Sequence, residues 1–307
     1  MVGDTNVDLE IRLPSGGVAP HANPDPRLFG GGSAANTAAA LARLGESCSF
    51  VGTVGDDSYG RFAVQSLADA GVDTQWTGIA SSQPTVMVVT VLTPDANRLI
   101  YVWPPRGGAH AELQSTPIVE ALNGAAWLHV SGICLRVSPA REAILDGMEQ
   151  ARSNGISVSL DLNLRLENWG WDGEFRHTIM AAVERSNVVM GDAKSEVVPL
   201  VGNQNPVEAA THLAGDDRIV VARMGADGAV ACSKTAAVVA PGYSVDVVDT
   251  VGAGDAFNAG FIASYFRRAD TIEALQWGNA VAAVTVSRPG ARATPALPEV
   301  TRFLATQ

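Results

Sequence analysis

The residues best suited to chemistry lie near the C-terminus, in the run Asp249-Thr250-Val251-Gly252-Ala253-Gly254-Asp255-Ala256-Phe257-Asn258-Ala259-Gly260. A strand-like segment ends at Val248, and a helix is expected to begin near Gly254. Small residues there allow a sharp turn that exposes consecutive N–H groups, which form an anion site at the positive end of a helix dipole. Asp255 at its mouth would suit proton transfer from a hydroxyl that attacks a phosphoryl group. Taken alone, the pattern equally fits a helix N-cap after a tight turn.

Two familiar nucleotide-binding patterns do not match. A dinucleotide fingerprint needs a third glycine where this run has Phe257, and Gly3-Asp4-Thr5-Asn6 at the N-terminus is not such a fingerprint either. A Walker A loop needs Gly-Lys-Ser/Thr, and the chain contains no Gly-Lys pair. A dinucleotide-dependent oxidoreductase is therefore disfavoured.

The twelve residues resemble the C-terminal signature of the ribokinase (PfkB) family, Asp-Thr-x-Gly-Ala-Gly-Asp-x-Phe-x-x-Gly, at every fixed position. The resemblance implies that Asp255 is the general base. It implies that the amides of Gly252, Ala253, Gly254 and Asp255 hold the transferring phosphoryl group. Thr250, Gly252 and Gly254 are further implied to lie against bound ATP.

A glycine-rich run near the N-terminus, Gly30-Gly31-Gly32-Ser33-Ala34-Ala35-Asn36, precedes an expected helix. Read alone, it indicates a flexible turn. Beside the C-terminal motif it resembles the family's Gly-Gly-x-x-x-Asn signature. This resemblance implies that the backbone at Gly31 and Gly32 approaches the substrate and that the Asn36 side chain binds substrate hydroxyls.

The first residues of the chain resemble the family's first strand. By that resemblance Asp8 pairs with sugar hydroxyls, and Asn6 is a second contact. A carboxylate accepts two hydroxyl donors at once, which suits a polyol. The alternatives are a solvated loop acid for Asp8 and an uninvolved side chain for Asn6.

Two segments resemble the family's nucleotide-binding parts. The stretch 220–228 is similar to the strand and Gly-x-x-Gly turn beside ATP, with Gly225 and Gly228 close to the nucleotide and Arg223 within reach of phosphates. A plain hairpin turn is the alternative. Asn279, on the last long expected helix, resembles the residue near the adenine.

Two further contacts are expected from other segments. Asp161-Leu162-Asn163-Leu164-Arg165 follows a strand, at the end where open α/β sheets bind ligands. It resembles the Asp-x-Asn-x-Arg of fructokinase-like and 2-keto-3-deoxygluconate kinase-like members, so Asn163 and Arg165 are expected to contact phosphates or substrate. Arg106 is expected to meet a carboxylate or phosphate of the substrate, or else to be an exposed turn residue.

Metal sites are implied only by the resemblance. Glu196 aligns with the glutamate that organises the Mg²⁺ water shell in the family's Asn-x-x-Glu motif, but Ala193 stands where the asparagine belongs. A solvated acid at a helix start is the alternative for Glu196. The ending 287–291 resembles the loop that binds a monovalent cation such as K⁺ together with the carbonyls of Asp249 and Val251.

The elements that must position these residues alternate between strands and amphipathic helices for most of the chain. This rhythm predicts a mostly parallel sheet covered by helices on both faces, and the resemblance implies a ribokinase-like three-layer α/β/α sandwich over residues 1–307. Thr85–Thr93 and Arg98–Trp103 interrupt the rhythm as a predicted hairpin around Pro94–Asn97. With the extended region near Val7, they are expected to form a small β-sheet lid, discontinuous over about 7–30 and 85–108.

Composition bounds the function. The chain has 307 residues, 47% hydrophobic and 17% charged, which is typical of a globular domain. A net charge of -11 without a dense Lys/Arg run disfavours binding to nucleic acid or to anionic membranes. Three cysteines without metal-ligand spacing and an N-terminus without a signal core predict a cytoplasmic protein.

The resemblance implies a kinase that uses ATP and Mg²⁺ to phosphorylate a hydroxyl of a small sugar or sugar acid. Fructose-like, ribose-like and 2-keto-3-deoxygluconate-like acceptors all remain open. The alternatives are a nucleoside kinase of the same fold and a catalytically silent sugar-binding protein. A homodimer is expected, because relatives pair their lid sheets and so protect strand edges.

Overall fold

The main sheet has six strands in the order β12-β11-β10-β9-β8-β7. The structure, a computed structural model, describes residues 1–307 except 14–25, 94–97, 106 and 203–204. Strands β7 to β10 are parallel, and β11 and β12 continue the sheet antiparallel. Their bounds are β7 Trp127–Ser131, β8 Ser157–Asp161, β9 Val188–Asp192, β10 Ile219–Arg223, β11 Ala229–Cys232 and β12 Ala237–Ala240.

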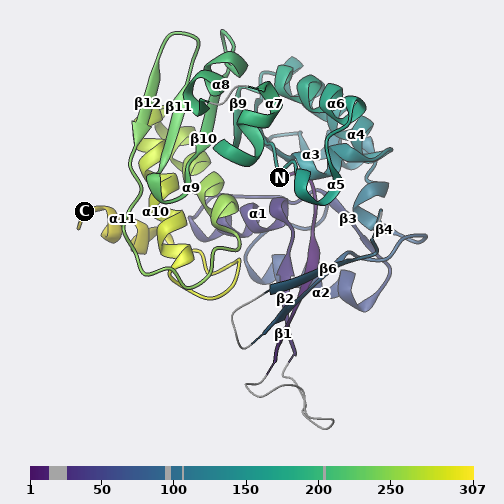
Figure 1. The fold of residues 1–307 in the computed structure, drawn as a ribbon. Coiled ribbons are helices and arrows are strands. Elements are labelled where there is room, and N and C mark those ends of the chain that lie inside the picture. The colour runs from purple at the N-terminus through teal and green to yellow at the C-terminus, as the bar shows by residue number, and fades with distance from the viewer. Residues whose placement is uncertain (14–25, 94–97, 106, 203–204) are drawn as a thin grey trace.

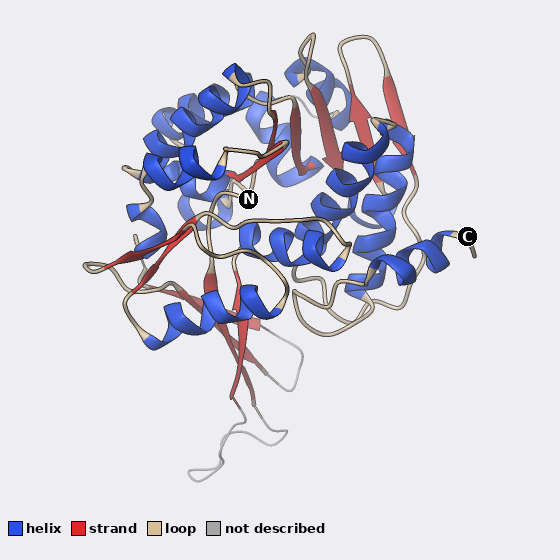
Figure 2. Ribbon diagram, turned by 180° about the vertical axis from the view of Figure 1, so that it is seen from behind, coloured by secondary structure: helices blue, strands red, loops and turns tan. Residues whose placement is uncertain are grey.

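Helices cover both faces of this sheet, because successive strand residues point to opposite sides and both sides are apolar. In β9, Val189 packs into one buried cluster, while Val188 and Met190 pack into another. Figures 1 and 2 show the helices that cover the two faces. The first cluster contains residues from α3 (Ser115–Ala121), α4 (Ala140–Ser153), α6 (Gly173–Glu184) and α8 (Pro206–Leu213), and the second contains residues from α1 (Ser33–Arg43), α9 (Ala253–Arg268), α10 (Thr271–Val286) and α11 (Leu297–Leu304). The predicted three-layer α/β/α arrangement is confirmed.

The N-terminus extends the sheet. Val2 forms parallel bridges to Val130 beside it and to Val51, which precedes β3. A strand pair, β3 (Gly52–Gly55) and β4 (Thr77–Ala80), therefore follows β7 at this edge, with α2 (Ser58–Asp69) between them in sequence.

A separate four-stranded sheet, called here the side sheet, has the order β2-β1-β5-β6. Its strands are β1 (Asn6–Arg12), β2 (Pro26–Gly31), β5 (Met87–Leu92) and β6 (Arg98–Trp103). The antiparallel pairing of β5 with β6 confirms the predicted hairpin, although its connection at 94–97 lies outside the described residues. Residues 14–25 of the expected lid also lie outside them. Figure 1 shows the side sheet projecting from the layered body.

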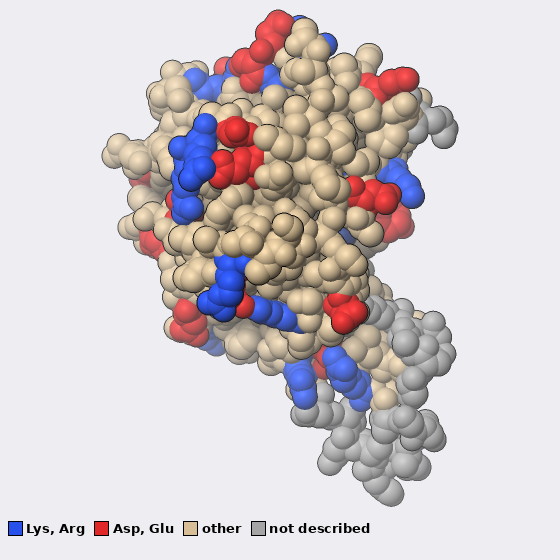
Figure 3. Space-filling model, turned by 90° about the vertical axis from the view of Figure 1, so that its left-hand side faces the viewer, with Lys and Arg blue, Asp and Glu red and all other residues tan. Residues whose placement is uncertain are grey.

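Shorter elements complete the chain between these layers. They are the α-helices α5 (Leu166–Trp169) and α7 (Val198–Val201), 3-10 turns at Ala109–Glu112, Gly132–Arg136 and Gly225–Asp227, and a π-helical turn at Ala193–Val197. Within the described ranges, no helix combines the length and apolar character needed to cross a bilayer. On the face shown in Figure 3, acidic and basic side chains are interspersed in small groups.

Candidate active site

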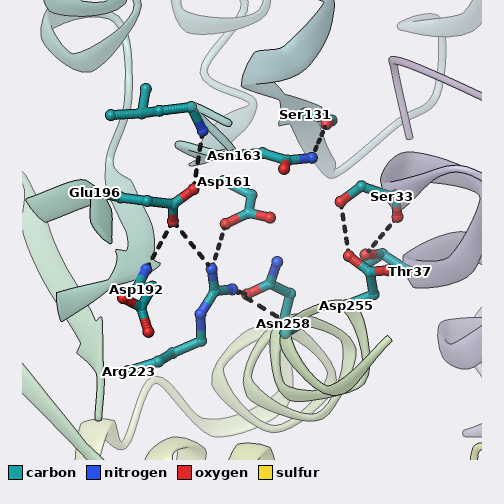
Figure 4. A network of polar contacts seen from close by, with 12 residues as sticks. Ser33, Thr37, Ser131, Asp161, Asn163, Asp192, Glu196, Arg223, Asp255 and Asn258 are labelled. Atoms are coloured by element: carbon teal, nitrogen blue, oxygen red, sulfur yellow. Dashed lines mark hydrogen bonds and ion pairs between the residues drawn. The ribbon is translucent and has the colours of Figure 1, made fainter. Parts of the chain in front are cut away.

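Asp255 lies in the first turn of α9 and points at the start of α1. Its Oδ1 accepts a hydrogen bond from Ser33 Oγ (2.6 Å), and its Oδ2 accepts one from Asn36 Nδ2 (2.9 Å). Figure 4 shows Ser33 facing this carboxylate across the gap between the two helices. Burial raises the pKa of Asp255 to about 7, the Ser33 and Asn36 hydrogen bonds oppose that rise, and the carboxylates of Asp161 and Asp4 add to it.

Free amides lie beside this carboxylate. Gly252, the N-cap of α9, has a φ of 79°, and a Cβ there would lie 2.4 Å from the carbonyl oxygen of Ala291. Among the described residues the Ala253 amide has only a 3.3 Å bond to Thr250, and the amides of Gly252, Gly254 and Asp255 donate to no protein acceptor. These N–H groups at the start of a 16-residue helix form a site able to bind an anion.

Asp249 joins two loops behind the amides. Its Oδ1 accepts from the Val251 amide (3.1 Å) and its Oδ2 from the Gly290 amide (3.1 Å). The loop at 287–291 is thereby held against the segment that leads into α9. The cation site expected from the carbonyls of Asp249 and Val251 would lie at this junction and stays a prediction.

The predicted acceptor-binding residues meet at the root of the side sheet. Asn6 Nδ2 donates to Asp8 Oδ1 (2.6 Å), and Gly31 pairs with Asn6 in the adjacent strand. A Cβ on Gly31 would lie 2.5 Å from Asp8 Oδ2, so a glycine is required for the two polar side chains to lie where they do. Burial raises the pKa of Asp8 to about 6, while the Asn6 hydrogen bond and the charge of Arg292 oppose the rise.

The turn from β2 into α1 is fixed by a side chain that the sequence analysis did not single out. Asp4 accepts hydrogen bonds from the amides of Ser33 (2.9 Å) and Ala34 (3.3 Å). Gly32 has a φ of 95°, and a Cβ there would lie 2.6 Å from the Asp4 carbonyl oxygen. Together they aim the first turn of α1, with Ser33 and Asn36, at Asp255.

A buried ionic cluster lies under the start of α9 (Figure 4). Arg223 donates through Nη2 to Asp161 Oδ1 (2.9 Å) and lies 3.5 Å from Glu196 Oε2. Through Nη1 it donates to Asn258 and to the Gly254 carbonyl (3.3 Å). Burial works against the charge of Arg223, but Asp161 and Glu196 hold its pKa above the usual value. Both terminal nitrogens are therefore engaged, Nη1 with α9 and Nη2 with the two carboxylates. Direct phosphate contact by Arg223 stays a prediction.

Glu196 is not a solvated acid at a helix start, and that alternative is wrong. It lies in the π-helical turn at Ala193–Val197 and is 8% exposed. Its carboxylate accepts from the amides of Leu164 (2.8 Å) and Asp192 (2.7 Å). Burial and Asp161 raise the pKa of Glu196, against the effects of Arg223 and the two amides.

The residues expected near the nucleotide surround the same opening. Asn163 Nδ2 donates to Ser131 Oγ (3.1 Å), and Asn163 and Arg165 both have left-handed backbone angles. Gly225 begins the 3-10 turn between β10 and β11, and Gly228 follows it, so this stretch forms the hairpin turn that was given as its alternative. Contact of the two glycines with the nucleotide stays a prediction. Asn279 Nδ2 donates to the carbonyls of Ala240 (3.1 Å) and Pro241 (3.0 Å) after β12.

One cleft of about 1880 Å³ brings nearly all the predicted residues together. Gly31 does not line this cleft, and Arg106 lies outside the described residues. The predicted residues that line it are Asn6, Asp8, Gly32, Asn36, Asn163, Arg165, Glu196, Arg223, Gly225, Gly228, Asp249, Thr250, Val251, Gly252, Ala253, Gly254, Asp255 and Asn279. Within the described ranges, no three His, Cys, Asp or Glu side chains are grouped to hold a metal ion.

Arg292, which follows the Gly290-Ala291 pair, is a further residue near the site that was not predicted. Its guanidinium donates to Asn36, Ser66 and the Gly31 carbonyl. In the sequence, Arg292 is notable only as a positive charge directly after the expected cation-binding loop. No local pattern indicates that its side chain reaches α1.

Comparisons with known proteins agree on one family. The model for the pfkB family carbohydrate kinases matches residues 1–299. Aminoimidazole riboside kinase of Salmonella typhimurium is 31% identical, covering 97% of this chain and 92% of its own, and 5-dehydro-2-deoxygluconokinase of Geobacillus thermodenitrificans is 31% identical, covering 89% and 83%. The crystal structure of fructokinase from Vibrio cholerae O395 in its fructose, ADP and calcium ion bound form has a TM-score of 0.81 at 30% identity, covering 99% of this chain and 97% of that one.

Proposed function

This chain belongs to the pfkB family of carbohydrate kinases, and we propose that it transfers the γ-phosphate of ATP to a hydroxyl of a fructose-like, ribose-like or 2-keto-3-deoxygluconate-like acceptor. Membership of the family makes it a phosphotransferase that acts on sugar hydroxyls. The observation that carries the finer proposal is Asp255, a carboxylate with a raised pKa beside the amides of Gly252 and Gly254, which have no acceptor among the described residues. A proton acceptor and an anion site are thus adjacent in one cleft.

In the proposed mechanism, Asp255 accepts the proton of the attacking hydroxyl. The amides of Gly252, Ala253 and Gly254 stabilise the negative charge on the phosphoryl group as it moves between oxygens. These donors are preorganised by the αL geometry of Gly252 and by the Arg223 contact to the Gly254 carbonyl. Little reorganisation is then needed when the charge develops.

The acceptor would lie on the opposite side of Asp255. Asp8 and Asn6 would bind its hydroxyls, Gly31 and Gly32 would let it approach the backbone, and the second hydrogen of the Asn36 amide would complete the set. The side sheet would cover this end as a lid and exclude water, which limits ATP hydrolysis. The contact proposed for Arg106 lies outside the described residues.

ATP would occupy the other end of the cleft, beside Thr250, Gly225, Gly228, Asn279, Asn163 and Arg165. The arrangement fits Mg²⁺ held mainly by phosphates and water, because Glu196 borders the cleft and its carboxylate is fixed by two amides. When bound, Mg²⁺ supplies charge neutralisation at the phosphates. The carbonyls of Asp249 and Val251 would hold a K⁺ ion where the Asp249 side chain joins the two loops.

The test combines one variant with an acceptor panel. ADP release from Mg-ATP is measured with fructose, ribose, 2-keto-3-deoxygluconate and nucleosides. Asp255→Asn should lower turnover by at least about 100-fold on the best acceptor while leaving its affinity largely unchanged. Asp270→Asn is the matched control, since Asp270 caps α10 and does not line the cleft. Near-normal turnover in Asp255→Asn refutes the base assignment.

Two alternatives are decided by the same panel. A nucleoside kinase of this fold is supported by the similarity to aminoimidazole riboside kinase and would turn over only nucleosides. A silent sugar-binding protein is supported by Ala193, which replaces the asparagine of the family motif. It would bind acceptors without releasing ADP in any reaction.

A homodimer formed through the side sheet is proposed on the basis of its exposed apolar side chains. One face of β6 carries three exposed apolar side chains at every second position: Leu99 (50% exposed), Tyr101 (60%) and Trp103 (51%). A second copy of the chain would cover this face and the unpaired edge. Tyr101→Glu should shift the light-scattering mass to that of a monomer, whereas Ile79→Glu, at a 70% exposed position on β4, should not. A monomeric mass for the unaltered protein at micromolar concentration refutes the proposal.

A further inference from the structure

Arg292 is a partly buried cation that touches three elements of the acceptor side without lining the cleft. Its Nε donates to Asn36 Oδ1 in α1 (2.9 Å), its Nη1 to Ser66 Oγ in α2 (2.8 Å) and its Nη2 to the Gly31 carbonyl in β2 (3.1 Å). Gly30 leaves room for it, because a Cβ there would lie 2.4 Å from Nη1. The fold therefore leaves a defined space for this side chain, and its three hydrogen-bond acceptors are an amide, a hydroxyl and a carbonyl oxygen.

The contact with Asn36 fixes the orientation of an amide. A guanidinium has donors and no acceptor, so only the Asn36 oxygen can face it. The Asn36 NH₂ group must then face the other way, where it lies 2.9 Å from Asp255 Oδ2. With the amide reversed, the Asn36 NH₂ group would face the Arg292 N–H donors, and the Asn36 oxygen would face the Asp255 carboxylate. Both contacts would be repulsive.

The charge of Arg292 also acts on the site. Burial lowers its pKa to about 10, with Asp8 and Asp255 opposing the change, so it stays protonated at neutral pH. The charged groups that act on Asp255 are Asp4 and Asp161, which disfavour its ionised form, and Arg223 and Arg292, which favour it. Arg292 thus acts on Asp255 from the acceptor side, and Arg223 acts on it from the side of the buried cluster.

We propose that Arg292 is a positioning residue for phosphoryl transfer: it holds the Asn36 amide so that its NH₂ group donates to Asp255 and faces the acceptor. This inference rests on the proposed role of Asp255 as the base. It predicts that Arg292 controls proton acceptance through Asn36, and not through any contact with the substrate.

The test is the pH dependence of kcat/KM, measured on the best acceptor from the panel. In Arg292→Met, the acid limb should move to higher pH by about 0.5–1 unit, because the carboxylate loses an ordered donor and a nearby cation. In an Asn36→Ala background, Arg292→Met should move the limb by clearly less than in the unaltered protein, since the two residues act as one unit. The proposal is overturned if folded Arg292→Met has the same acid limb as the unaltered protein. It is also overturned if Arg292→Met shifts the limb equally with and without Asn36→Ala.

A control separates positioning from loss of stability. Arg218 is also a largely buried arginine, bonded to the carbonyls of Leu213 and Val183 and to Glu184, and it does not line the cleft. Arg218→Met should lower the unfolding midpoint without moving the acid limb. If Arg292→Met does not fold, Arg292→Lys is used in its place. One ammonium group cannot reach all three partners, so the acid limb should again move to higher pH, by less than in Arg292→Met. An unchanged acid limb in Arg292→Lys overturns the proposal.

Failure of this inference is distinguishable from failure of the proposed function. If Asp255→Asn is inactive while the acid limb of Arg292→Met is unchanged, Asp255 remains the base and the role of Arg292 is refuted. If Asp255→Asn keeps near-normal turnover, the base assignment fails, and the role of Arg292 fails with it.

Discussion

Replacing Asp255 by asparagine should stabilise the fold at alkaline pH while it removes activity. Burial raises the pKa of this carboxyl from 3.8 to about 7, so the folded protein holds a proton that the unfolded chain has lost. Below about pH 4, both states are protonated and the carboxyl has no pH-dependent effect. As the pH rises to about 7, the unfolded state is progressively favoured, and above that the cost is constant.

The difference between the two pKa values sets the size of this effect on stability. A rise from 3.8 to about 7 corresponds to about 4 kcal/mol of lost stability above pH 7. Relaxation around a buried charge reduces such values, so we expect a measured gain of about 1–3 kcal/mol for Asp255→Asn at pH 8. Asparagine can keep both neighbours, because its oxygen accepts from Asn36 and its NH₂ group donates to Ser33 Oγ.

Urea unfolding at pH 5 and at pH 8 measures this difference. The gain of Asp255→Asn over the unaltered protein should be larger at pH 8 than at pH 5. The control Asp270→Asn should change little at either pH, since asparagine caps a helix about as well as aspartate. A variant that is less stable than the unaltered protein at pH 8, or a gain that does not depend on pH, would refute the reasoning about the buried carboxyl.

Three further outcomes are expected. The kcat/KM of the unaltered protein should fall below about pH 7, as the carboxyl of Asp255 becomes protonated, and a flat profile between pH 5 and 8 would contradict this. Gly31→Ala should raise the acceptor KM at least about tenfold, because its Cβ would lie 2.5 Å from Asp8 Oδ2; isothermal titration with the acceptor checks this independently. Gly252→Ala should lower the free energy of unfolding by about 1–3 kcal/mol more than Gly124→Ala, which has a similar positive φ but open space around it; equal losses would contradict the crowding at Ala291.

The sequence predicted the parts of the site that depend on local geometry. The glycines before α9 and the spacing from Gly31 to Asn36 fix turns and helix starts, and these are encoded within a few residues. The succession of strand-like and helix-like segments likewise predicted the three layers. Each parallel strand is covered on both faces, so it appears in the sequence as a continuous apolar run. The antiparallel continuation through β11 and β12 was not predicted, since its short alanine- and valine-rich strands carry little periodic signal.

The features that the sequence does not predict depend on tertiary contacts. Glu196 is drawn into the protein by a π-helical turn and by two backbone amides, and no local pattern distinguishes it from an exposed acid. Arg292 and Asn36 are 256 positions apart, so their hydrogen bond follows from the packing of α1 against the C-terminal segment. Polar networks of this kind are specified by the fold and not by spacing along the chain.

The environment of Asp255 suits its proposed role as general base. Among the described residues its carboxylate receives hydrogen bonds from two neutral side chains, Ser33 and Asn36, and forms no direct ion pair. A guanidinium bonded to it would favour the ionised form and weaken its affinity for the incoming proton. Instead, Arg292 acts through the Asn36 amide, and Arg223 is engaged with Asp161 and the Gly254 carbonyl. Both cations are therefore held one residue away, which keeps the carboxylate ordered and still basic enough to accept a proton near neutral pH.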